Sequence, residues 1–92
     1  MSMGARPLPR KFEFHWGKGL VTEEASVVTP YFEPTVQLLV YDSGERAIRF
    51  CGYEHGKMGR YPLVVSEQHL ERIGAELRKN KELHRLLKRL VG

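Results

Sequence analysis

The chain has 92 residues, of which 41% are hydrophobic and 28% charged, and its net charge is +4. This length supports one small domain, and the composition is that of a folded chain and not of a disordered one. The single cysteine rules out an internal disulfide bond, which suits a reducing compartment. No apolar run approaches the ~20 residues that span a bilayer, and no apolar segment follows the first basic residues. We therefore expect a cytoplasmic protein without a signal peptide or a membrane segment.

The N-terminal segment contains Gly4, Pro7 and Pro9 and shows no periodicity. Such a composition is typical of a mobile terminus. We expect a flexible tail over residues 1–9, followed by a single domain over residues 10–92.

Strict alternation of aromatic and polar residues begins at residue 11 and predicts a half-buried strand over residues 11–16. The aromatic residues of this segment share one side of the strand; they are Phe12, Phe14 and Trp16. A turn is expected at residues 17–19. A less regular strand follows over residues 20–29, interrupted near Glu23-Glu24.

A β-hairpin over residues 35–53 is the central prediction. Two segments rich in β-branched and aliphatic residues flank Asp42-Ser43-Gly44. A three-residue loop with Gly44 in the left-handed conformation pairs Leu38 with Ile48. Five apolar residues then share one face, which we expect the following helices to cover: Val36, Leu38, Val40, Ile48 and Phe50.

The opposite face of the hairpin is mixed. Gln37 lies opposite Arg49, and Leu39 and Ala47 lie beside this polar pair. A slip of one residue would exchange the two faces, so the apolar set should determine the register.

Two short helices are predicted at the C-terminal end. Ser66 is a candidate N-cap, and an apolar stripe follows at helical spacing: Leu70, Ile73, Gly74 and Leu77. The stripe then restarts roughly 120° out of phase, at Leu83, Leu86, Leu87, Leu90 and Val91. We expect a break near Lys79-Asn80, with Asn80 capping the second helix; a continuous helix with two buried faces is the alternative.

The strands precede the helices without β-α-β alternation, and this order predicts an α+β domain. We expect a small antiparallel sheet of about four strands, including the hairpin over residues 35–53. Two short C-terminal helices should follow, packed on one face.

A metal site or a thiol nucleophile would have to use Cys51 and His55, with His15 from another strand. Zinc is usually held by four ligands, often in two closely spaced pairs, and only one such pair exists here. Nothing in the local sequence orients an imidazole toward the thiol, and the common catalytic and nucleotide-binding motifs are absent. We predict no metal, no cofactor and no enzymatic activity.

Two kinds of binding surface remain as candidates. Surplus apolar side chains favour a protein interface, with the terminal helix and an aromatic set as its candidates: Phe12, Phe14, Trp16, Tyr31 and Phe32. Residues 78–92 hold six basic residues and one acidic residue, which favours an anionic partner. The candidate nucleic-acid contacts are Lys79, Lys81, Arg85, Lys88 and Arg89. Our first expectation is a non-enzymatic interaction module of unknown process, self-associating or bound to another protein. The alternative is a nucleic-acid-binding protein that uses the basic C-terminal helix.

Overall fold

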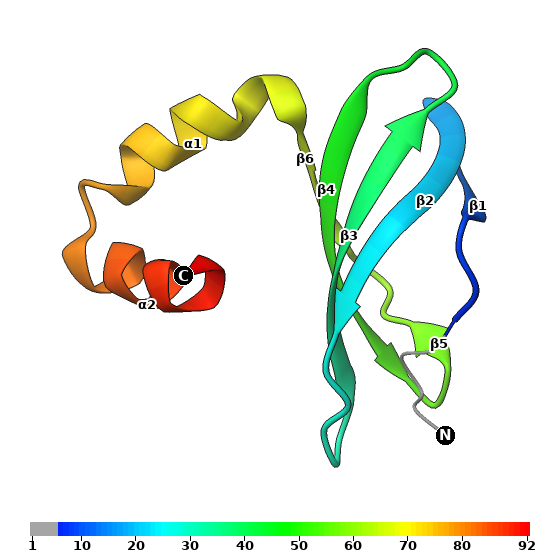
Figure 1. Cartoon of the computed structure of the whole chain (residues 1–92), viewed down its shortest axis with the longest axis horizontal. Helices are drawn as coiled ribbons and strands as arrows, with labels where there is room; N and C mark the ends of the chain where they lie inside the picture. Colours follow the sequence, from blue (N-terminus) through cyan, green and yellow to red (C-terminus); the bar gives the residue numbers. More distant parts are fainter. Residues whose placement is uncertain (1–5) are drawn as a thin grey trace.

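The computed structural model describes residues 6–92 and shows a curled antiparallel sheet with two helices beyond one side of it (Figure 1). In chain order the elements are β1 (Arg10–Phe14), β2 (Gly17–Ser26), β3 (Glu33–Tyr41), β4 (Arg46–Glu54), β5 (Lys57–Met58), β6 (Leu63–Ser66), the 3-10 turn η1 (Glu67–His69), α1 (Leu70–Leu77) and α2 (Lys81–Val91). The predicted α+β class is confirmed. The sheet has more strands than the expected four, because two short segments after the hairpin also pair with it.

Strands β1 to β5 follow one another as neighbours, and β6 then returns to β4. Strand β4 is long enough to serve two partners along the same edge. Its end at Tyr53 and Glu54 pairs with β5, and its part from Ala47 to Phe50 pairs with β6.

The predicted hairpin register is confirmed. Leu38 lies opposite Ile48, and the loop closes through a 2.8 Å hydrogen bond from Gly44 N to Tyr41 O. Gly44 has φ +93°, the left-handed conformation for which glycine was expected.

The first turn lies two residues earlier than predicted. Phe14 pairs with Gly17, so His15 and Trp16 form the turn and residues 17–19 belong to β2. A Cβ atom on Gly19 would lie 2.0 Å from Val40 O, so the glycine allows β2 and β3 to approach each other here.

The irregularity expected near Glu23 takes the form of a β-bulge. Val21 pairs with Leu39 and Glu24 pairs with Gln37, so β2 has one extra residue between these two positions. As a result, Val21 and Glu24 both point to the same side of the sheet although they are three residues apart.

The face of the sheet that is buried is the opposite of the one we expected. The buried apolar core lies on what we call the inner face; it consists of Phe12, Val21, Leu39 and Ala47. Gln37 and Arg49 share this face and are also buried. The face of Leu38 and Ile48, which we call the outer face, is therefore not the main core, because the curl of the sheet encloses the other side.

The two predicted helices and the break between them are confirmed. Neither Ser66 nor Asn80 makes a side-chain capping bond at the start of a helix. Instead Asn80 Nδ2 donates to Glu76 O at 3.1 Å and so binds the end of α1. Both helices lie on the outer side of the sheet, reached through η1, which contacts β4 (Figure 1).

Part of the predicted N-terminal tail, residues 1–5, lies outside the described residues. Arg6, within the same predicted tail, forms ion pairs with Glu24 and Glu33. Within residues 6–92, none of the helices is both long and apolar enough to cross a membrane.

Candidate interaction surface

The outer face carries apolar side chains on four strands, interrupted by Glu23 of β2 and Arg46 of β4. We call it the apolar outer face, and it comprises Leu20, Val36, Leu38, Val40, Ile48, Phe50, Leu63 and Val65. Its exposure is highest toward β6, where Phe50 is 39% exposed and Leu63, its partner across the strands, is 60% exposed. Contiguous exposed apolar surface on a small chain commonly marks a binding site.

The second apolar surface belongs to the segment formed by η1, α1 and α2, which we call the helical arm (residues 67–91). Neither α1 nor α2 buries any residue. Both helices are amphipathic, yet Leu86 and Leu90 are 56% and 63% exposed. A helix of this length normally gains its stability from packing an apolar side, so this arm lacks the surface that would cover it.

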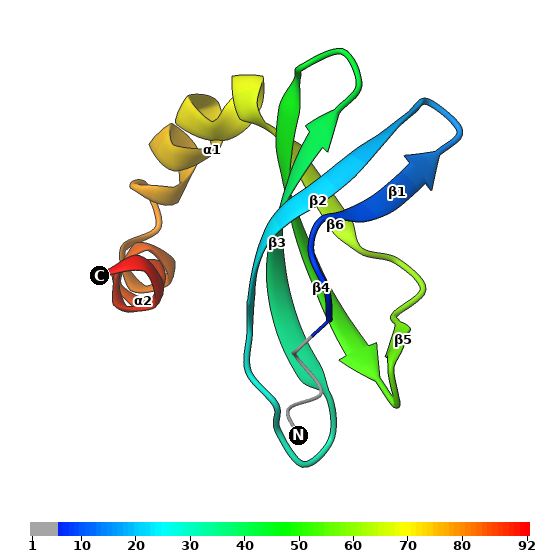
Figure 2. The same ribbon diagram turned by 45° about the vertical axis from the view of Figure 1, so that its right-hand side comes forward.

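The root of the arm is tied to the sheet. Arg46 of β4 donates two hydrogen bonds, of 3.0 and 2.6 Å, to the carboxylate of Glu67 in η1. Leu70 lines a small hollow of about 120 Å³ together with Leu38 and Ile48. Beyond this point α1 leads away from the strands, and α2 follows below α1 with its axis steeply inclined to that of α1 (Figure 2).

The size of the uncovered surface can be compared with that of an ordinary monomer. The chain exposes 7368 Å², whereas a compact chain of 10.6 kDa is expected to expose ~5,500 Å². Its radius of gyration is 14.3 Å, against about 12 Å for a compact domain of the same length. The exposed surface is therefore about 1,900 Å² larger than that of a compact chain. The radius of gyration is also larger than that of a compact domain.

The aromatic residues predicted to form an interface are divided by the fold. Phe12 is a core residue and is buried. Phe14 packs against the core and stacks on Trp16 with ring centroids 4.6 Å apart. Trp16 itself is 62% exposed because it lies in the turn and not in the strand.

Tyr31 and Phe32 lie in the loop between β2 and β3, at the end of the sheet away from the arm (Figure 1). Thr29 N donates to Phe32 O at 3.1 Å and closes this loop. The Phe32 ring packs over Gly52, and Tyr31 is almost fully exposed. The structure therefore does not bring these two residues together with Trp16 into one surface.

The basic residues predicted to contact nucleic acid are all exposed, and two of them form local ion pairs. Lys79 pairs with Glu76 at 3.0 Å, and Arg85 pairs with Glu82 at 2.6 Å. Such exposed pairs contribute little to stability. Among the ion pairs of residues 6–92, none involves the other predicted nucleic-acid contacts, Lys81, Lys88 and Arg89.

An ionic cluster fills one half of the inner face, and the sequence analysis did not foresee it. Gln37 Nε2 donates to Glu24 Oε2 at 2.6 Å and to the Tyr53 hydroxyl at 3.0 Å, while Arg49 Nε donates to Gln37 Oε1 at 2.6 Å. Arg10 binds Glu24 at 2.7 Å. Every one of these polar groups has a charged or hydrogen-bonding partner, as burial requires.

The cluster extends to Glu33. Arg6 donates two hydrogen bonds to the Glu33 carboxylate, at 3.2 and 3.0 Å, and its guanidinium lies 3.7 Å from the centre of the Tyr53 ring. Ser26 also donates to Glu33. These hydrogen bonds from Arg6 and Ser26 hold the pKa of Glu33 below its usual value. The arrangement joins the N-terminal segment to the sheet. The Glu33 carboxylate is occupied by hydrogen bonds from Arg6 and Ser26, which belong to the fold itself.

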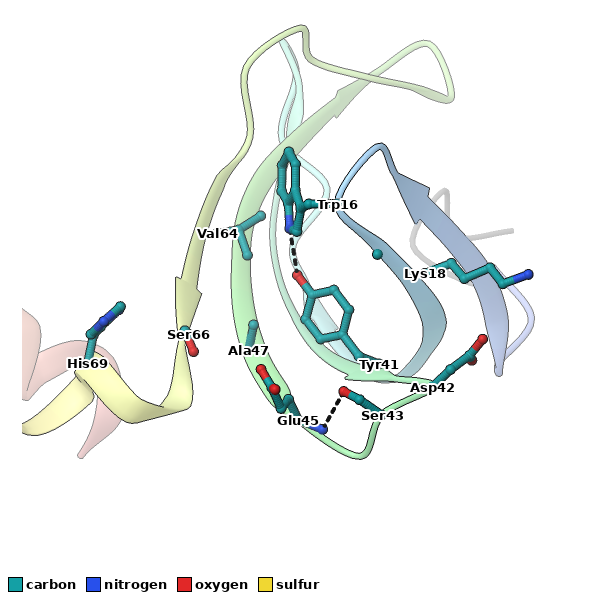
Figure 3. Close-up of a pocket in the computed structure, with 11 residues that line it drawn as sticks. Trp16, Lys18, Tyr41, Asp42, Ser43, Glu45, Ala47, Val64, Ser66 and His69 are labelled. Atoms are coloured by element: carbon teal, nitrogen blue, oxygen red, sulfur yellow. Dashed lines mark hydrogen bonds between the residues drawn. The ribbon is translucent and has the colours of Figure 1, made fainter.

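A cleft of about 580 Å³ opens at the other end of the inner face (Figure 3). Trp16 and Tyr41 form one side of it, and Trp16 Nε1 donates to the Tyr41 hydroxyl at 3.4 Å. The opposite side holds Val64 and Ser66 of β6, with His69 beyond them. The volume is in the range of small-molecule sites, but the polar side chains around it do not form a nucleophile–base pair.

Cys51 and His55 do not assemble into a metal centre. No cluster of three or more potential metal ligands occurs within residues 6–92. Burial raises the pKa of the Cys51 thiol above its ordinary value, which disfavours the reactive thiolate. His55 has φ 53° and lies in the β4–β5 turn.

Comparison with family models, with curated proteins and with solved structures finds no match for this chain. The function is therefore inferred from the geometry of the chain itself. Sequence reasoning named the aromatic set and the terminal helix as the interface but assigned Leu38, Ile48 and Phe50 to the core. The signal that could have placed these three at an interface was the number of separate apolar segments competing for so small an interior.

Proposed function

We propose that this chain is a non-enzymatic interaction module that self-associates through the apolar outer face and the helical arm. The observation that carries the proposal is that two apolar surfaces of one small chain are both left uncovered. Burying water-exposed apolar side chains lowers the free energy of the system, and this is the main driving force of protein association.

The amount of uncovered surface supports a second copy as the partner. An excess of about 1,900 Å² on each chain, if covered in a dimer, corresponds to the interface size of obligate homodimers. Such interfaces resemble a domain core that has been divided between two chains, which is the relation between this sheet face and this arm.

Light-scattering mass across a range of protein and salt concentrations tests the proposal. We expect twice the chain mass of 10.6 kDa, unchanged between low and high salt, because apolar contacts are not screened. Leu38→Lys should give a monomer at the same concentration, since it introduces a charge at the centre of the apolar outer face. Val27→Lys is the matched control, because Val27 is also exposed but lies in the β2–β3 loop, and it should leave the mass unchanged. A wild-type chain that remains monomeric at every concentration would contradict the proposal.

The basic side of α2 favours nucleic-acid binding as a second candidate. Lys88 and Arg89 lie in the last turn of α2, where cations also interact favourably with the helix dipole. Their position therefore has a structural explanation that needs no ligand, and this candidate ranks second.

A further inference from the structure

We infer that the two copies exchange their helical arms, so that the arm of each copy covers the apolar outer face of the other. This inference rests on the proposed self-association and specifies its geometry. The interface would then consist of two equivalent contacts related by a two-fold axis, each made of one arm and one sheet face.

Within one copy, the arm leads away from its own sheet. The double hydrogen bond between Arg46 and Glu67 fixes η1 against β4, and Leu70 is the part of the arm that reaches Leu38 and Ile48. From there α1 extends away from the strands, as both views show (Figures 1 and 2). After the short connection of residues 78–80, α2 turns back below α1 (Figure 1). Ile73 of α1 and three leucines of α2 remain exposed: Leu83, Leu86 and Leu90.

Helix α2 and the apolar outer face also match in size. A helix of eleven residues such as α2 is about 16 Å long. The apolar outer face crosses four neighbouring strands, β2, β3, β4 and β6, which span about 14 Å. One α2 helix laid across the strands therefore fits the width of the face.

Symmetry also favours the exchange. Each copy carries one face and one arm, so a pair of copies can satisfy both surfaces on both chains and leave nothing open for a third. Such a closed, self-complementary contact is the usual form of a homodimer. A face-to-face dimer would cover the sheet but leave Leu83, Leu86 and Leu90 in water.

Complementation between two defective variants tests the exchange in the full-length chain. Leu38→Lys disables the face and keeps the arm, whereas Leu86→Lys disables the arm and keeps the face. Each variant alone should be monomeric because neither arm-on-face contact is intact. In a 1:1 mixture one of the two contacts is intact, so the mean mass should rise toward twice the chain mass.

A cysteine pair identifies which chain the arm covers. In a Cys51→Ser background, Ile48→Cys on the face is combined in turn with Leu83→Cys, Leu86→Cys or Leu90→Cys on α2. Exchange predicts a covalent dimer under mild oxidation for at least one of the three, because a disulfide needs Cβ atoms about 4 Å apart. Arg85→Cys, on the polar side of α2, is the control and should not link.

The outcomes separate the inference from the function on which it rests. A wild-type dimer whose mixed variants stay monomeric, or whose cysteine pairs all close within one chain, would overturn the exchange and leave self-association standing. A wild-type monomer with intrachain links would overturn both, because the arm would then cover its own sheet.

Discussion

Gln37 on β3 and Arg49 on β4 lie directly opposite each other on the inner face, joined by a 2.6 Å hydrogen bond from Arg49 Nε to Gln37 Oε1. Gln37 is 1% exposed and Arg49 is 6% exposed. A cation this deep is tolerated only while its partners are present. Because these polar groups have partners, the curled sheet can enclose them, while apolar residues remain on the outside.

Replacing Gln37 with leucine tests the importance of this pair. The leucine has a similar size but leaves Arg49, Glu24 and Tyr53 each without one hydrogen bond. We expect the free energy of unfolding to fall by about 2–4 kcal/mol, as when one member of a buried polar network is removed. Urea denaturation at one protein concentration measures it. Gln68→Leu, at an exposed position in η1, is the matched control and should change little; equal stability of the two variants would refute the importance of the pair.

Acid should weaken the fold through Glu24 and Glu33. Burial raises the pKa of Glu24, but hydrogen bonds from Arg10 and Gln37 and the charges of Arg10 and Arg6 outweigh it, so the pKa lies below the ordinary 4.5. The pKa of Glu33 is also lowered. The unfolded chain therefore binds more protons than the folded chain near pH 4.5, and stability falls as pH drops from about 5 through the folded-state pKa values.

The urea midpoint measured between pH 7 and pH 3 checks this dependence. Glu24→Gln should make the decline shallower, because one of the two responsible carboxylates no longer titrates. The comparison uses the slope and not the absolute stability, which the substitution also changes. An identical slope in variant and wild type would exclude Glu24 as a source of the pH dependence.

Gly19 should not tolerate a side chain. In Gly19→Ala the new methyl group would lie 2.0 Å from Val40 O and 2.7 Å from Tyr41 Cα, so β2 and β3 would have to separate. We expect a loss of about 3 kcal/mol, at the upper end of overpacking effects. In Gly59→Ala the nearest atom, Gly52 O, is 3.6 Å away, so thermal unfolding should show a large shift for the first variant and almost none for the second.

The basic side of α2 can be separated from the interface. Arg85, Lys88 and Arg89 alternate along the helix with its leucines, so replacing all three with glutamine removes charge without removing the apolar stripe. We expect the light-scattering mass to remain that of a dimer. Any affinity for a mixed-sequence oligonucleotide should disappear, and in the wild type it should fall steeply with salt. A variant that loses the dimer would show that these cations take part in the interface.

The hairpin register follows from the sequence alone because it depends on neighbouring residues. Gly44 accepts the left-handed conformation, and alternation along two adjacent strands sets Leu38 opposite Ile48. The helix break follows for the same reason, since the phase of the leucine stripe changes within a few residues. Both features depend on residues that are close together in the sequence, so sequence patterns predict them.

The choice of buried face does not follow, because the partners of the polar residues come from distant segments. Gln37 obtains Glu24 from β2, outside the hairpin. It also bonds Tyr53 of β4, although Tyr53 pairs across the strands with Glu33 and not with Gln37, so cross-strand pairing alone does not indicate this contact. The interface predicted from the sequence did not include the outer face, for a related reason. An apolar residue such as Ile48 has the same local signature whether it is covered by its own chain or left open.

The bulge in β2 lies between two halves of the inner face, the carboxylate cluster and the aromatic end. One half can be disrupted without the other. Val21 and Glu24 both face inward because β2 holds one extra residue, Thr22, between the positions opposite Leu39 and Gln37. Regular alternation through Thr22 would instead turn Glu23 and Ala25 inward and Glu24 and Ser26 outward. A pairing of β2 with β3 that lacked the bulge would therefore dismantle the carboxylate cluster while leaving the aromatic end of the sheet with its original neighbours. The local register of the strand, together with the identity of its charged side chains, decides which acid it presents to the interior.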